Sequence, residues 1–339
     1  MNSPYPWQAT EWAQLQARAA QRRLPHALLV TGPAGVGKRV FADAFARSLL
    51  CKRPMGDGAD NSTACGGCEA CLLLRAGTHP DYLTVTFIED KTQIGIDQIR
   101  ELCRALSLKS HAGGYKIAIL TPAERMTVEA ANSLLKTLEE PTDNTLLILV
   151  TEQPARLAAT IRSRCQLLRF PAPPLEMGST WLAAQIGDQD SSRNAGLLMR
   201  LSDAAPLRAL ALAHDNSVAQ RRDWLEQIIA VRRGQQSPIA VAAAWNDDAQ
   251  MRPLYWFGSY LMDLMRLEYG GFEYIKNIDL TDLLKVIADG MSSRDLHSLL
   301  ERVGQTQQLA QQAGMNRQLL LEELLTEWSR VGQTRRVRA

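Results

Sequence analysis

A glycine-rich stretch near the amino terminus constrains this chain more than any other feature. Residues 32–39 read G-P-A-G-V-G-K-R, which matches the phosphate-binding loop pattern G-x-x-x-x-G-K-[ST] except at its last position. In that pattern backbone N–H groups surround phosphate oxygens, the lysine faces the outer phosphates, and a Ser or Thr hydroxyl holds Mg²⁺. Here Arg39 replaces the hydroxyl, so the loop predicts a nucleotide cradle that lacks one magnesium ligand. The candidate nucleotide contacts are Gly32, Gly35, Gly37 and Lys38.

The residues around this loop predict the strand and the helix that a phosphate loop requires. Residues 26–31 are an apolar run typical of a buried strand, and residues 39–50 carry apolar residues at helical spacing. Further strands are expected at 82–88, 116–120 and 146–150, with helices at 96–108 and 128–140. Strands that alternate with helices indicate an α/β domain with a parallel sheet.

The second half of the chain has a different character. Prolines at 171, 173 and 174 mark a composition change, beyond which strand patterns almost vanish. We therefore predict a nucleotide-binding-like domain over 1–170, a small helical domain over 171–214 and a larger helical domain over 215–339. Large apolar side chains in the last part are expected to form its core; they are Trp224, Trp256, Tyr260 and Trp328.

The composition limits the classes of function. Hydrophobic residues make up 46% and charged residues 22% of the chain, as in ordinary globular proteins. The 38 Lys and Arg residues nearly balance the 36 Asp and Glu residues, for a net charge of +2, so a uniformly basic nucleic-acid face is not expected. No apolar run is long enough for a membrane span, and residues 1–10 do not resemble a secretory signal. We expect a cytoplasmic protein whose six cysteines are thiols or metal ligands.

Four of these cysteines have the spacing of a metal site. They follow the pattern C-x13-C-x2-C-x2-C, and two-residue gaps let thiolates converge on one tetrahedral ion. They are Cys51, Cys65, Cys68 and Cys71. A closed Cys₄ site is structural, so we predict a structural zinc that fixes residues 51–71. Reduced thiols, a redox pair and an iron–sulfur cluster are the alternatives, and Cys103 and Cys165 are expected to be buried thiols.

A second magnesium-handling position is also absent. Hydrolysing enzymes of this type carry a strand that ends in acidic residues, which hold Mg²⁺ and orient water. Here the strand at 116–120 is followed by Thr121 and Pro122, and we expect the nearest acid, Glu124, to point elsewhere. No ATP hydrolysis by this chain alone is expected. A bound but unhydrolysed nucleotide and an empty relic turn both stay open.

Residues 153–170 contain no acidic residue and are rich in arginine. Such a stretch can bind the phosphates of a nucleotide or a nucleic acid, or it can be an ordinary solvated face. The arginines are Arg156, Arg162, Arg164 and Arg169.

Together these features resemble the bacterial DNA polymerase III clamp-loader family, and most closely its delta-prime subunits. The resemblance is carried by S-L-L-K-T-L-E-E-P at 133–141, S-R-C at 163–165, G-T-H-P-D at 77–81 and the cysteine insertion after the phosphate-loop helix. It implies an AAA+ fold with a nucleotide-binding domain, a helical lid and a helical collar. The family's motor subunits carry an acidic D-E pair where this chain has Thr121 and Pro122, which separates it from them.

The resemblance also implies a role in DNA replication. The chain would be the non-hydrolysing member of a hetero-pentamer with gamma/tau motor subunits and a delta subunit, within the DNA polymerase III holoenzyme, a nucleotidyltransferase. This complex places a sliding clamp on primer–template DNA. Arg164, next to Ser163, is implied to be an arginine finger that reaches the γ-phosphate of ATP on a neighbouring motor subunit. Thr151 matches the family's phosphate-sensing position, and Arg208 resembles its lid arginine.

Two other functions remain as alternatives. The chain could be an ATPase in its own right that uses unusual metal ligands. It could also be a zinc-dependent nucleic-acid-binding protein without ring partners, although its small net charge argues against strong binding of DNA by the chain alone.

Overall fold

The structure is a computed structural model that describes residues 3–56, 62–88, 91–186, 194–288, 291–310, 312 and 314–331. The chain divides into two compact units, Met1–Met177 and Gly178–Ala339, which are treated separately below. No helix in the described ranges is both long and apolar enough to span a bilayer.

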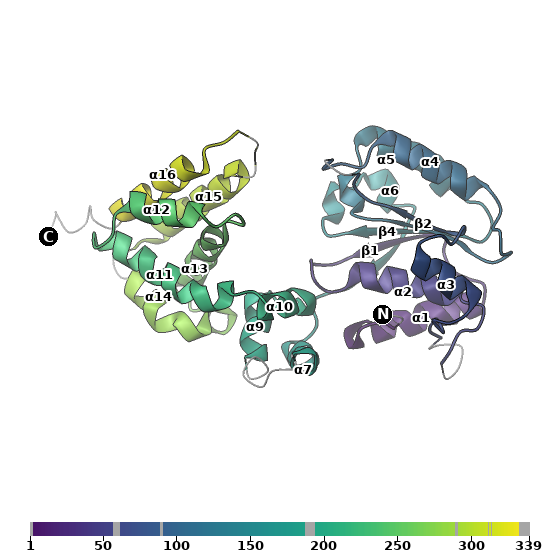
Figure 1. Ribbon diagram of the computed structural model, residues 1–339, viewed down its shortest axis with the longest axis horizontal. Coiled ribbons are helices and arrows are strands. Elements are labelled where there is room, and N and C mark those ends of the chain that lie inside the picture. Colours follow the sequence, from purple (N-terminus) through teal and green to yellow (C-terminus); the bar gives the residue numbers. More distant parts are fainter. Residues whose placement is uncertain are drawn as a thin grey trace. The chain divides into compact units, whose positions relative to one another are not determined.

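The first unit is built on a five-stranded sheet in which every pairing is parallel (Figure 1). The strand order is β2-β3-β4-β1-β5. The strands are β1 Ala27–Thr31, β2 Tyr82–Val85, β3 Lys116–Leu120, β4 Thr145–Thr151 and β5 Gln166–Arg169. The three inner strands are buried along their whole length, which explains their continuous apolar sequences.

Helices cover both faces of this sheet (Figure 1). On β1, Leu28 and Val30 join the core formed with α1 and α2, whereas Ala27 and Leu29 join the core formed with α4 and α5. This alternation follows from the two-residue period of a strand. The helices are α1 Ala9–Ala20, α2 Lys38–Leu50, α3 Glu69–Ala76, α4 Ile96–Ser107, α5 Val128–Glu139 and α6 Ala159–Arg162.

The second unit is helical throughout its described residues. The helix α7 Leu175–Gln185 begins at the boundary and packs with α9 Ala195–Leu201 and α10 Pro206–Ala213. A larger core unites the remaining helices and contains the four aromatic side chains predicted to be buried there. These helices are α11 Ser217–Arg232, α12 Pro238–Asn246, α13 Arg252–Glu268, α14 Thr281–Ala288, α15 Ser293–Ala310 and α16 Arg317–Arg330.

The predicted strands and helices of the first half are present with small shifts in their ends. The strand expected at 82–88 ends at Val85, and the helix expected at 96–108 ends at Ser107. The edge strand β5 and the helices α1 and α6 were not predicted. The tail arginines 335, 336 and 338 lie outside the described residues.

Candidate functional site

The phosphate loop connects the end of β1 to the start of α2, in the strand–loop–helix context that its sequence predicts. Gly37 caps α2 in a left-handed conformation with φ 86°. A Cβ atom at Gly37 would lie 2.5 Å from the Tyr5 ring, and one at Gly32 would lie 2.1 Å from the Phe170 carbonyl oxygen. Both positions therefore require glycine. Gly35, with φ 83°, adds a further left-handed residue.

An amino-terminal segment is hydrogen-bonded to the backbone of this loop. In the short 3-10 helix Pro6–Gln8, Trp7 Nε1 and Gln8 Nε2 both donate to the Val36 carbonyl, at 2.9 and 3.0 Å. Two side-chain hydrogen bonds thus hold the loop backbone at Val36. No motif in the sequence indicated these contacts.

The Lys38 side chain is buried and contacts groups of the same chain. Its side chain is only 5% exposed, and Nζ donates to the Pro33 carbonyl at 2.7 Å and lies 3.7 Å from Glu152 Oε1. Burial lowers the pKa of Lys38, while the negative charges of Glu152 and Glu124 oppose that effect. The ammonium group that would contact phosphate already has a carbonyl and a carboxylate beside it.

Glu124 does not point elsewhere, so that prediction was wrong. The 3-10 turn Ala123–Arg125 packs against β4 and returns the side chain to the carboxyl end of the sheet. There Glu124 Oε1 accepts from the Glu152 backbone N–H at 3.3 Å, and its charge acts on Lys38. Glu124 Oε2 is buried without a hydrogen-bond partner among the described residues. Sequence reasoning missed Glu152 altogether, although it directly follows the predicted phosphate-sensing position.

Arg39 stands where the loop pattern has a hydroxyl residue, and its side chain pairs with a residue of the same helix. Its Nε donates to Asp43 Oδ2 at 2.8 Å, one turn further along α2. The hydroxyl of Tyr82, on β2, bonds to the other oxygen of Asp43. Arg39 is therefore tied into a network that offers no magnesium ligand at this position.

Two further predicted contacts lie in different units. Thr151 is buried at the end of β4, where Oγ1 accepts from the Gln153 backbone at 3.1 Å. Arg208 lies on α10 in the second unit, with Nη2 3.4 Å from the Tyr255 hydroxyl oxygen. The roles of both toward a nucleotide remain predictions.

The four predicted metal ligands converge. All four sulfur atoms lie within 4.8 Å of one another, with Cys51–Cys68 and Cys65–Cys71 separations of 3.8 and 4.0 Å. A tetrahedron with metal–sulfur bonds of about 2.3 Å has edges of about 3.8 Å, whereas a disulfide needs about 2.05 Å. The spacing fits four ligands of one ion.

Backbone groups favour the thiolate form of Cys65 and Cys68, whereas burial raises the pKa of Cys51 and raises that of Cys71 to about 12. The backbone N–H groups of Cys65 and Cys68 donate to the sulfurs of Cys51 and Cys65, each at 3.3 Å. Burial raises the pKa of Cys68, but hydrogen bonds from the backbone of Cys71 and Lys52 outweigh it and lower the value to about 6. These four cysteines could hold a metal ion.

Cys103 and Cys165 do not join the cysteine site. Cys165 is buried in the core beneath α5, where burial raises its pKa to about 12. Cys103 is half-buried, with Sγ 3.9 Å from the Ser133 carbonyl oxygen. The predicted burial is thus complete for Cys165 and partial for Cys103.

Arg164 lies where the S-R-C and S-L-L-K-T-L-E-E-P segments meet. Its Nη2 is 2.6 Å from Glu139 Oε1 and its Nη1 donates to the Thr160 carbonyl at 3.0 Å. The side chain keeps 35% exposure. Ser163 is exposed and donates to the same carbonyl at 3.2 Å, and the catalytic role that the resemblance implies for it remains a prediction.

The G-T-H-P-D segment contains a buried carboxylate. Asp81 accepts hydrogen bonds from the Ser110 hydroxyl and from the backbone of His111 and Ala112, at 2.9, 2.9 and 3.0 Å. The segment therefore fixes the loop that precedes β3, which is a structural task.

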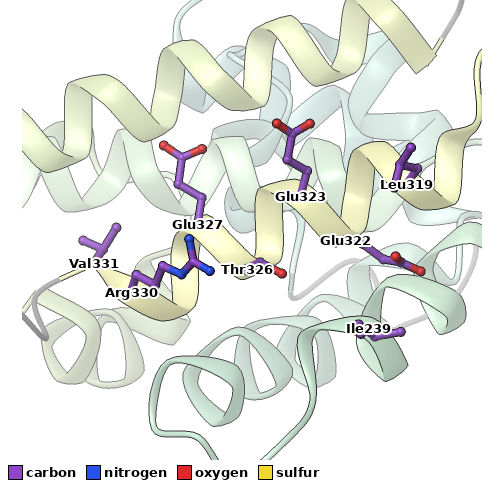
Figure 2. A pocket seen from close by; sticks show the side chains of 8 residues that line it. All are labelled: Ile239, Leu319, Glu322, Glu323, Thr326, Glu327, Arg330 and Val331. Atoms are coloured by element: carbon purple, nitrogen blue, oxygen red, sulfur yellow. The ribbon is translucent and has the colours of Figure 1, made fainter.

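The second unit has a groove between α12 and α16 (Figure 2). Ile239 and Leu319 line it with 58% and 60% of their surface exposed. Figure 2 shows carboxylates along α16 beside them, including Glu322 and Glu323. Exposed apolar side chains within a polar rim are typical of a protein contact surface.

Known proteins resemble this chain over nearly its whole length. Residues 7–174 match the family model described as DNA polymerase III, delta subunit, and residues 215–330 match the model for the C terminal of that subunit. The DNA polymerase III subunit delta' of Pseudomonas aeruginosa is 37% identical over 329 residues, which cover 96% of this chain and 97% of that protein. The corresponding protein of Escherichia coli is 35% identical, covering 95% and 94%.

A second class of relative shares only part of the chain. The DNA polymerase III subunit tau of Bacillus subtilis is 33% identical over 156 residues, or 46% of this chain and 26% of that protein. The α/β fold followed by helices, which the resemblance to clamp-loader AAA+ proteins predicted, is confirmed. The chain belongs to the family of DNA polymerase III delta-prime subunits.

Proposed function

We propose that this chain is a non-hydrolysing clamp-loader subunit that supplies Arg164 in trans to the ATP site of a neighbouring motor subunit. One observation carries the proposal: the chain's own nucleotide loop lacks its magnesium ligand, while a half-buried arginine elsewhere keeps an exposed face. An arginine supplied in trans neutralises charge that develops on the γ-phosphate. The incomplete site and the available arginine together suit a subunit that activates another.

The state of the chain's own loop supports the non-hydrolysing part. Arg39 is bonded to Asp43 rather than being free for a metal-bound phosphate, and β3 is followed by Thr121 rather than by an acid. Without a metal the developing charge has no main counter-ion. ATP held by this loop would stay intact. Its contacts would be Gly32, Gly35, Gly37, Lys38 and Thr151, with Arg208 from the lid.

The metal is proposed to be a structural Zn²⁺. Four thiolate ligands that converge on one point select zinc or an iron–sulfur cluster, and sulfur pairs 3.8 and 4.0 Å apart suit a single ion. Among the described residues, the surrounding cluster consists of the cysteines with Ala64 and Ala70. Such a small core gains much of its order from a bound ion.

The proposed partners are the gamma/tau motor subunits and the delta subunit of a hetero-pentamer, with the sliding clamp and primer–template DNA reached through the complex in the cytoplasm. The proposed domains are 1–170, a lid at 171–214 and a collar at 215–339. The match to a separate carboxy-terminal family model over 215–330 supports the last boundary. The groove between α12 and α16 suits a collar surface that contacts another subunit.

Reconstitution with the motor and delta subunits tests this function. Arg164→Ala should leave assembly unchanged in size-exclusion chromatography and lower the ATPase that clamp and primed DNA stimulate. A finger in trans is worth about 10³ to 10⁵ in rate at the site it serves, so turnover at that site should nearly stop and the total rate of the loader should fall severalfold. Arg162→Ala, an exposed neighbour, is the matched control. Unchanged ATPase in an assembled Arg164→Ala complex would reject the proposal.

One observation favours a second candidate, an ATPase with unusual metal ligands. Glu124 lies at the carboxyl end of the sheet with a buried oxygen that has no described hydrogen-bond partner, and Glu152 stands beside Lys38. Two carboxylates near a phosphate loop could ligate a cation. Turnover by the purified chain alone, abolished by Lys38→Ala, would support this candidate.

A further inference from the structure

Two segments that are distant in sequence are joined by one ion pair. Glu139 is the last residue of α5, within S-L-L-K-T-L-E-E-P, and Arg164 is the central residue of S-R-C. Glu139 Oε1 and Arg164 Nη2 are 2.6 Å apart. The acidic end of the first segment thus meets the arginine of the second.

The core fixes the positions of both partners. On α5, Leu134 and Leu138 are buried on the face of the sheet that also buries Ile161 and Cys165. These buried residues lie within one to five positions of Glu139 and Arg164 in the sequence. Because the four side chains share one core, the distance between the Glu139 and Arg164 backbones is set by packing rather than by a loose loop.

The contacts leave part of the guanidinium available. An arginine side chain has five N–H donors in a rigid plane. The Thr160 carbonyl takes a hydrogen bond from Nη1 and Glu139 pairs with Nη2. The side chain is still 35% exposed, so further N–H groups can reach a ligand outside the protein.

The pair is too exposed to matter much for folding. The Glu139 side chain is 49% exposed, and ion pairs this accessible to solvent contribute little to stability. A free arginine, however, loses rotamer entropy when it is held in one orientation. An ion pair that orders the side chain beforehand reduces that cost at the moment of reaction.

We propose that Glu139 is a positioning residue for Arg164. Its carboxylate and the Thr160 carbonyl hold the guanidinium from the protein side, and the remaining N–H groups face the γ-phosphate of the neighbouring site. This proposal rests on the proposed function, because Glu139 can position Arg164 for catalysis only if Arg164 acts in trans.

The test uses the reconstituted loader with Glu139→Ala, Glu139→Asp, Arg164→Ala and the double variant Glu139→Ala with Arg164→Ala. Glu140→Ala is the matched control, since this residue is adjacent and exposed but makes no ion pair in the described structure. The readouts are kcat and KM for ATP with clamp and primed DNA, together with the thermal midpoint of the chain.

Glu139→Ala should lower kcat about twofold, less than Arg164→Ala does, with KM unchanged, because misplacement of a group that acts in the transition state reduces kcat. Its thermal midpoint should match that of Glu140→Ala. Glu139→Asp should recover part of kcat, and the double variant should be no slower than Arg164→Ala.

Three results would overturn the proposal. Equal kcat for Glu139→Ala and Glu140→Ala, with Arg164→Ala still impaired, would reject the positioning role and leave the proposed function intact. A raised kcat would mean that Glu139 restrains the arginine. A wild-type rate for Arg164→Ala would reject the proposed function, and the positioning role with it.

Discussion

Replacing Cys68 with Ser tests whether the four cysteines hold a metal that orders their segment. The purified wild-type chain should contain about one zinc, since its four sulfurs lie within 4.8 Å of one another. Changes in outer-shell partners alone cost about 10- to 100-fold in metal affinity. Loss of a ligand itself should therefore cost more than about 100-fold and remove zinc during purification.

The structural effect should be local. Cys51 follows α2 and Cys71 lies on α3, and both helices are anchored in the large core through Leu50 and Leu74. The small cluster around the cysteines has little apolar surface of its own. The main core should stay folded, because its apolar cluster does not include the cysteines, although loss of a metal is among the larger destabilising changes.

Zinc content and amide hydrogen exchange provide the assay. The backbone N–H groups of Cys65 and Cys68 donate to sulfur, so their exchange should accelerate in Cys68→Ser, while amides of β3 and β4 keep their protection. Cys103→Ser, outside the cluster, is the control. A full zinc content in Cys68→Ser, or a metal-free wild-type chain whose exchange does not respond to a chelator, would show that these cysteines do not hold an ordering metal.

Two other predictions concern the first unit. Asp81→Asn should destabilise the chain by about 1.5–3 kcal/mol in urea unfolding at pH 7. Burial raises the pKa of Asp81, but hydrogen bonds from the backbone of His111 and Ala112 lower it overall. Because the folded-state pKa is depressed, this stabilisation is fully present above the unfolded value near 4 and is lost as pH falls through the folded value. An unchanged difference between variant and wild type at pH 2.5 would contradict it. Gly37→Ala should cost about 1–3 kcal/mol, from the left-handed φ and the overlap with Tyr5; a thermal midpoint equal to that of wild type would be inconsistent with that overlap.

The sequence predicted those parts of the site that depend on local pattern. The glycine loop, the α/β alternation and the cysteine spacing are each defined by residue types at fixed intervals, and the structure has all three. The short edge strand β5 escaped prediction because four residues, Gln166–Arg169, are too few to show a period. The helix α1, which buries Trp12 and Leu15, was not predicted because it precedes the glycine loop and is part of no recognised motif.

The features that were missed depend on tertiary contacts. Glu124 was expected to point away from the loop because it lies beyond the end of β3, but a 3-10 turn returns it to Glu152. No spacing rule relates Glu152 to Lys38, or Glu139 to Arg164, because each pair comes from two elements that only the folded sheet brings together. Side-chain pairing across a fold is set by packing and is not encoded in a local period.

The most direct measurement compares Lys38→Ala with Arg164→Ala in the reconstituted loader and in the isolated chain. We expect no ATP turnover by the isolated chain, a loader ATPase that is insensitive to Lys38→Ala, and a severalfold loss with Arg164→Ala. Turnover by the isolated chain that Lys38→Ala abolishes, with a loader that tolerates Arg164→Ala, would contradict this expectation.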